Sequence, residues 1–474
     1  MTTDRTEVVQ SNAVGVDELT ETLTDEVEVT MPGGTKRVNP VDEILPVGQM
    51  FAYGLQHVLA MYAGAVAVPI IIAQGLGLST ELLTCLINAD LMAAGIATLI
   101  QTLGVWKIGA RIPMIQGVSF ASVAPMLVIG REFGFTAIFG AVIVAGLIGF
   151  LISPYFSKLI RFFPPVVTGT IITLIGISLL PVAVRWAGGG NPNSADFASL
   201  HNLGLAIITL AIVVLEYRVF KGFISNLSIL IGLMGGTMVA YFMGYTDFSA
   251  VGHADWVGIV PPLYFGFPRF EWSAILSMLI VMLVIMVETT GDCIAIGEIV
   301  GRKINKPHLA ACLRADGIST ALAGVLNTFP HSAFAQNVGL VAVTGIKSRY
   351  VVACSGIILL VLGLFPKMGA LIASIPSAVL GGAGLAMFGM IIASGIRALG
   401  KVSFEGNYNL MIVAVSISVG MITLVYPSFF ARFPEWAQTV MHSGITLGSL
   451  VAVLMNVLLN GSEGHPSDRP DKIK

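Results

Sequence analysis

Glu288 and Asp292 lie inside a long apolar run at 273–298. Ionisable side chains are costly within a membrane and are typical of ligand sites and proton pathways there. Four residues apart on a helix, the two carboxyls share one face. In a site of low dielectric constant, a carboxyl group can take up and release a proton near neutral pH. We therefore predict that Glu288 binds a ligand and carries a coupling proton, whereas Asp292 fits a coupling role and a structural role equally well.

Asp316 and His57 are further ionisable groups in apolar surroundings. Asp316 follows Arg314 closely, so it either takes part in proton coupling or forms a structural pair. His57 is a lone membrane histidine, for which a hydrogen-bonded packing role competes with titration. Both residues join Glu288 and Asp292 as candidates for proton coupling.

The stretch at 327–349 has the wrong composition for a lipid-facing helix, because backbone freed by Pro and Gly, and amide side chains, need partners that hydrocarbon lacks. Interrupted helices at mid-membrane are typical of transporter substrate sites. The adjacent amides of Gln336 and Asn337 offer donors and acceptors to a planar ligand. The polar and helix-breaking residues of this stretch include Pro330, His331, Ser332, Gln336, Asn337 and Gly339.

A second interrupted stretch, at 112–125, is bounded by Pro113 and Pro125 and contains Gln116 and Ser119. We expect the two broken stretches to face each other and to pair as short extended segments, which would satisfy their backbone groups. The helices that follow would direct two N-termini at one ligand, and this favours an electron-rich or anionic substrate.

The composition identifies a polytopic membrane protein. The 474 residues are 55% hydrophobic and only 11% charged, against roughly a quarter charged in soluble domains. Continuous apolar runs of about 20 residues indicate helices rather than barrel strands. We predict fourteen spans, at 47–72, 81–104, 112–129, 134–153, 165–184, 199–216, 224–243, 273–298, 308–325, 331–345, 350–373, 377–396, 406–424 and 440–459.

The basic residues test this count, since cytoplasmic loops concentrate Lys and Arg. With the N-terminus inside, fourteen of the 25 basic residues lie at the inner ends of spans, six lie in the tails, and the outer ends hold only Arg131, Arg185, Arg269, Lys367 and Arg432. Both termini are therefore expected to be cytoplasmic.

An internal repeat relates the two halves of the chain. Pro164, Val167 and Gly169 at the start of the fifth span recur as Pro376, Val379 and Gly381 at the start of the twelfth. Seven spans separate them, and an odd number per repeat requires opposite topology in the two halves. The partner of the broken tenth span is then the broken third span.

The combined motifs resemble those of the nucleobase–ascorbate transporter family, also called nucleobase:cation symporter-2, over essentially the whole spanning region. The resemblance is closest to the bacterial uric acid and xanthine permeases. Its motifs are Gln336-Asn337-Val338-Gly339, Thr344-Gly345, Glu288, Asp316-Gly317 and Gln116-Gly117-Val118-Ser119-Phe120.

The resemblance implies an all-α fold of fourteen spans in two inverted seven-span repeats, divided into core and gate domains, with spans three and ten broken. The expected divisions are a disordered cytoplasmic tail at 1–40, core at 41–155, gate at 156–272, core at 273–375, gate at 376–459 and a second cytoplasmic tail at 460–474.

The resemblance also implies a site and a function. Glu288 hydrogen-bonds a purine, Gln336 contacts its other edge, and Phe120 lies against the base; Ser119, Ala121 and Asn337 border the same site. The implied function is proton-coupled import of uric acid or xanthine through the bacterial inner membrane by an elevator-type mechanism. The implied partners are the purine, membrane lipid and a second copy of the chain.

Other classes fit less well. A uracil or other nucleobase:proton symporter and an anion exchanger of similar architecture remain alternatives. An enzyme is disfavoured, since the sequence has no phosphate loop, catalytic triad or metal-ligand spacing. We expect no metal, no cofactor beyond the coupling proton, and no nucleic acid partner. The four cysteines are scattered singly, and this spacing excludes a disulfide framework.

Overall fold

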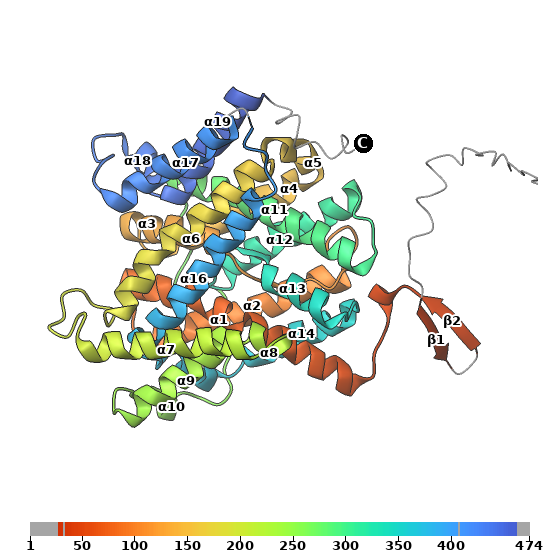
Figure 1. Ribbon diagram of the computed structural model, residues 1–474, viewed down its shortest axis with the longest axis horizontal. Coiled ribbons are helices and arrows are strands. Elements are labelled where there is room, and N and C mark those ends of the chain that lie inside the picture. The colour runs from red at the N-terminus through yellow and green to blue at the C-terminus, as the bar shows by residue number, and fades with distance from the viewer. Residues whose placement is uncertain (1–26, 32–33, 406–407, 462–474) are drawn as a thin grey trace, which may run out of the picture.

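The computed structural model describes residues 27–31, 34–405 and 408–461, most of which lie in one bundle of helices (Figure 1). In the first half these are α1 (Val47–Leu76), α2 (Thr80–Leu103), α3 (Val123–Phe133), α4 (Phe135–Ile152), α5 (Phe156–Leu159), α6 (Pro165–Ala187), α7 (Leu200–Val219), α8 (Phe223–Asn226), α9 (Ser228–Phe242) and α10 (Ser249–His253). In the second half they are α11 (Trp272–Val300), α12 (Lys306–Val325), α13 (Ala335–Thr344), α14 (Arg349–Leu362), α15 (Pro366–Ala373), α16 (Ser377–Leu399), α17 (Tyr408–Val425), α18 (Glu435–Met441) and α19 (Gly444–Asn460).

The helices have the length and composition of membrane spans. Within the described ranges, eight are long and apolar enough to cross a membrane, and α14 with α15 forms a further candidate bent by 81°. The bend falls at Pro366, which cannot continue the preceding helix. The prediction of a mostly helical polytopic membrane protein is therefore confirmed.

The N-terminal region differs from the expected tail without regular structure. Strands β1 (Val27–Met31) and β2 (Gly34–Val38) pair as an antiparallel hairpin that lies away from the bundle (Figure 1). The expected disorder of residues 1–26 and of 462–474 lies outside the described residues.

Two short strands pair with each other within the helical bundle. Strand β3 (Gln116–Val118) pairs antiparallel with β4 (His331–Ala333). The Ser119 N–H donates to the Pro330 carbonyl at 2.9 Å, and the Phe334 N–H donates to the Ile115 carbonyl at 3.2 Å. This pairing satisfies backbone that no helix accommodates, and it confirms the prediction that the two broken stretches meet.

A threonine of the preceding helix anchors the first residue of each strand. Thr98 Oγ1 of α2 accepts from the Gln116 N–H at 3.0 Å and donates to the Gln116 carbonyl at 3.3 Å. Thr320 Oγ1 of α12 accepts from the His331 N–H at 3.2 Å and donates to the His331 carbonyl at 3.5 Å. Both strands are thus held at mid-bundle by side chains of long helices.

Helices α6 and α16 begin after Pro164 and Pro376 and pack side by side (Figure 1). A Cβ added at Gly381 would lie 2.1 Å from the Ala187 backbone nitrogen. Glycine thus permits close backbone approach, a common device between membrane helices.

Replacing Gly381 with valine should destabilise the protein by about 1–3 kcal/mol, because the backbone of α6 cannot yield as a side chain would. Thermal unfolding of the detergent-purified protein measures this effect. Gly389→Val is the matched control, since Gly389 lies on the same helix with open space around it. Equal melting temperatures for the two variants would contradict this account of the α6–α16 contact.

Candidate functional site

Glu288 lies on α11 where that helix passes the end of β3. Its side chain is half-buried and hydrogen-bonds to the Ser119 hydroxyl. Ser119 Oγ also accepts from the Ala121 N–H at 3.3 Å. The break after β3 therefore fixes both Ser119 and the carboxylate beside it.

Asp316 of α12 is completely buried against the strand pair. Its Oδ1 accepts from Gln116 Nε2 at 3.0 Å, and its carboxyl also hydrogen-bonds to the Thr289 side chain. Thr289 Oγ1 in turn accepts from the Ala333 N–H of β4 at 3.2 Å. Asp316 is therefore linked to both strands and, through Thr289, to the helix that carries Glu288.

Asp292 brings a third carboxyl to this region. It lies close enough to Glu288 and Asp316 to interact electrostatically with both. Like charges repel strongly in a low-dielectric site, so the three carboxyls favour one another's protonation. The cluster is therefore suited to holding protons.

Asn337 joins α13 to α1 through His57. Its Nδ2 donates to His57 Nδ1 at 2.8 Å and lies 3.3 Å from the His57 carbonyl oxygen. Both side chains are buried. In this arrangement Asn337 and His57 fix the position of α13 against α1.

Gln336 is exposed on a face of α13 that also includes Ala335 and Gly339. Helix α13 packs against α1 and α11. The Gln336 amide is accessible at the N-terminal end of α13. The first N–H groups of that helix have no intrahelical partner.

Phe120 follows β3 and contacts helix α16. Its ring lies edge-on to that of Phe388 on α16, with centroids 6.1 Å apart. Ala121, next to it, is buried.

Beyond Glu288, helix α11 runs on to one end of the bundle, where it ends at Val300. Gly291 and Glu298 are exposed at helical spacing beyond Glu288. Basic loops lie at that end, where Arg302 Nη1 donates to the Arg111 carbonyl and Arg314 Nη1 donates to the Lys107 carbonyl. We call this end of the bundle the basic end.

The sequence predicted the main members of this cluster but not its supports. Thr98, Thr289 and Thr320 anchor the strands, yet single threonines in apolar helices give no distinctive pattern. Phe388 was missed because its role depends on contact between distant helices. A buried pair, Asp90 and His331, lies at the other end of the strands.

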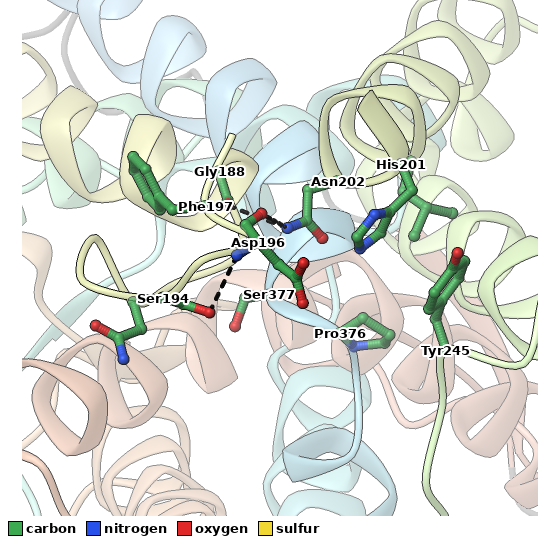
Figure 2. A pocket seen from close by; sticks show the side chains of 12 residues that line it. Gly188, Ser194, Asp196, Phe197, His201, Asn202, Tyr245, Pro376 and Ser377 are labelled. Atoms are coloured by element: carbon green, nitrogen blue, oxygen red, sulfur yellow. Dashed lines mark hydrogen bonds between the residues drawn. The ribbon is translucent and has the colours of Figure 1, made fainter. Parts of the chain in front are cut away.

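A separate pocket of about 290 Å³ lies where the α6–α7 loop meets the start of α16. Figure 2 shows Asp196 and Asn202 directed into it, with His201 and Tyr245 along one side. None of its lining residues belongs to the Glu288 cluster. Within the described ranges, no three His, Cys, Asp or Glu side chains converge as a metal site would require.

Residues 48–429 match a family model described as a permease family. The chain is 45% identical to the uric acid transporter UacT of Escherichia coli K12 over 437 residues, which cover 91% of this chain and 90% of that protein. It is 46% identical to a xanthine permease of Bacillus subtilis 168 over 413 residues, covering 87% and 94%. It is also 43% identical to the uric acid permease PucK of the same organism, covering 89% and 97%.

Solved structures share the fold at lower identity. The transmembrane domain of the cyanobacterial bicarbonate transporter BicA superposes with a TM-score of 0.55 and 16% identity, covering 86% of this chain and 96% of that one. Murine Slc26a9, an anion transporter, gives a TM-score of 0.57 and 12% identity, covering 89% and 70%. These likenesses establish a fold that the chain shares with those two proteins.

Proposed function

Because the chain belongs to the permease family of nucleobase–ascorbate transporters, we propose that it is a proton-coupled symporter that imports uric acid or xanthine. It is a transporter and not an enzyme. The observation that carries the proposal is the half-buried Glu288, held by Ser119 at the break after β3.

The site offers what an oxidised purine requires. Such a purine presents alternating N–H and C=O groups around a flat ring. Glu288 and the Gln336 amide can meet opposite edges, and Phe120 can cover a face. The N-termini of α3 and α13 add partial positive charge that suits an electron-rich ring. In this proposal Ser119, Ala121 and Asn337 shape the site around the base.

Proton coupling is assigned to the carboxyl cluster. A proton on Glu288 or Asp316 removes a buried negative charge and so stabilises the loaded state. Asp292 adds to the repulsion that favours protonation, and His57 holds the start of α13 through Asn337. The coupling ion is the proton, and no other cofactor is proposed.

We assign fourteen spans in two inverted repeats, and equivalent helix contacts support this assignment. If α2 corresponds to α12 and α4 to α14, then the α2–α14 contact is the counterpart of the α12–α4 contact, and both are observed. The threonine anchors of β3 and β4 correspond in the same way. Under the proposal, residues 41–155 and 273–375 form the core, and 156–272 and 376–459 form the gate.

The proposed elevator motion moves the core against the gate, so contacts across their boundary must break as the motion proceeds. At the end away from the basic loops, the Trp186 Nε1–H of the gate donates to Gln74 Oε1 of the core. Nearby on the same proposed boundary, Thr439 Oγ1 donates to Glu132 at 2.8 Å and His442 Nδ1 lies 3.1 Å from that carboxylate. These contacts fit a state closed at the end away from the basic loops.

Replacing Trp186 with phenylalanine should shift the carrier about fivefold towards opening at the closed end, because one hydrogen bond contributes about 1 kcal/mol. A single cysteine introduced at Leu179, on the same face of α6, would react faster with an impermeant maleimide added outside. Trp256→Phe, in an exposed loop, is the control. An unchanged labelling rate in the Trp186 variant would contradict the assigned closing contact.

The basic loops support cytoplasmic termini and a plasma-membrane location, the bacterial inner membrane. A homodimer is proposed from the family resemblance. The alternatives are a uracil or other nucleobase:proton symporter, and an anion exchanger. Glu288 beside the site disfavours the exchanger, since a carboxylate repels anions.

Competition for labelled xanthine uptake tests the proposed substrate. Excess urate or unlabelled xanthine should inhibit uptake strongly, whereas uracil should not. Equal inhibition by uracil, or none by urate, would contradict import of oxidised purines. Including guanine and hypoxanthine shows which oxo groups the site requires.

A further inference from the structure

Asp90 and His331 form a buried pair at the end of the strand pair away from Asp316. Asp90, on α2, is 1% exposed, and His331, the first residue of β4, is fully buried. His331 Nε2 lies 3.9 Å from Asp90 Oδ1, which also accepts from Thr328 Oγ1 at 2.5 Å. Asp90 Oδ2 has no hydrogen-bond partner among the described residues, and the His331 imidazole interacts with the backbone of Phe329.

This pair corresponds to the contact between Gln116 and Asp316. Gln116 is the first residue of β3, and its side chain reaches an aspartate on α12, the helix whose threonine anchors β4. His331 is the first residue of β4, and its side chain reaches an aspartate on α2, the helix whose threonine anchors β3. The first side chain of each strand thus contacts an aspartate of the helix that anchors the other strand. That side chain is an imidazole in β4 and an amide in β3.

Charge balance requires a proton at this pair. A fully buried lone carboxylate is too costly, so either the carboxyl is neutral or the imidazole is positively charged beside it. In each case the two side chains hold one proton more than a carboxylate with a neutral imidazole. Gln116 cannot hold an additional proton beside Asp316, because an amide side chain does not titrate.

No other charged group neutralises the pair within the described ranges. Of the helices packed on α2, α12 carries Asp316 at the opposite end of the strands, and its Arg314 bonds a loop carbonyl. Arg349 of α14 binds Asp42, and Lys367 of α15 donates to the Val251 carbonyl. None of the remaining titratable groups on these helices, on the two strands or on α11 forms an ion pair or hydrogen bond with Asp90 or His331. These groups are Tyr53, His57, Tyr62, Glu81, Cys85, Glu288, Asp292, Cys293, Glu298, Lys306, His308, Cys312, Tyr350 and Cys354.

We propose that Asp90 and His331 are a second proton-binding site of the transport cycle. The inference rests on the proposed proton coupling. The proton adds from water, forming one O–H or N–H bond, and returns to water when that bond breaks. Because His331 begins β4 and α13 follows that strand directly, protonation of the pair positions Gln336 for the substrate. Asp90 and His331 are positioning residues and do not touch the purine.

Asp90→Asn and His331→Gln test the proposal in the full chain reconstituted into proteoliposomes. A coupled proton sustains about tenfold accumulation of substrate per unit of pH gradient. In each variant, xanthine accumulation should fall towards the external concentration, while xanthine–xanthine exchange, which needs no net proton movement, should stay within about twofold of wild type. Asp90→Glu keeps the carboxyl and should retain accumulation.

Two results would overturn the proposal. One is wild-type accumulation in both variants. The other is an equal loss of accumulation and exchange at normal protein abundance, which indicates a purely structural pair. The substitutions lie on different elements, so misfolding of one leaves the other informative. If the wild-type protein itself does not accumulate xanthine in a pH gradient, the proposed coupling fails, which is a distinct outcome.

Discussion

Replacing Glu288 with glutamine should reduce xanthine and urate uptake about 100-fold, since a hydrogen bond to a charged group contributes about 1.5–3 kcal/mol. Glutamine keeps the shape of the side chain and can still bond to the Ser119 hydroxyl. It removes the titrating group and one acceptor for a ring N–H. Initial rates of labelled xanthine uptake in cells, normalised to protein abundance, measure the effect.

Glu298→Gln is the matched control. Glu298 lies on the same helix, three turns towards the basic end, and is exposed. Its substitution should leave uptake within about twofold of wild type, as is usual for surface changes of under 0.5 kcal/mol. If the Glu288 variant accumulated xanthine as the control does, Glu288 would have no part in binding or coupling.

Replacing Gln336 with alanine should raise the KM for xanthine about 10–100-fold, because a polar edge of the purine would lose its partner, at a cost of about 1–3 kcal/mol. Gln336 is exposed and buries no core surface. Protein abundance and thermal stability should therefore stay unchanged.

Val343→Ala is the control for Gln336, since Val343 is 58% exposed two turns along the same face of α13. Its KM should match that of the wild type. A Gln336 variant with normal KM but altered competition by urate would instead indicate a contact that only discriminates between purines. Normal KM and normal competition together would remove Gln336 from the site.

The pairing of β3 with β4 was predictable because Pro, Gly and amides at mid-membrane leave few alternatives. The cluster of Glu288 and Asp316 followed from the cost of buried charge. The threonine anchors and the Asp90–His331 contact were not predictable, since they depend on which faces of α2 and α12 meet the strands. His331 was noted in the sequence only as one polar residue of its stretch.

The number of spans was harder to establish than the fold class. Helix α12 lies in a predicted span, yet its Arg314 and Asp316 lower its hydropathy, and it is not among the eight strongly apolar helices. The predicted span at 350–373 is divided into α14 and α15 by a sharp bend. Apolar runs locate such segments but do not determine whether each crosses the membrane straight.

Proton-driven purine uptake by the reconstituted protein tests the central claim most directly. In proteoliposomes with an inward proton gradient of one pH unit, labelled xanthine should accumulate about tenfold above equilibrium if one proton is coupled. A protonophore should abolish this accumulation. Xanthine uptake that continued unchanged after the gradient was collapsed would contradict proton coupling and favour the exchanger alternative.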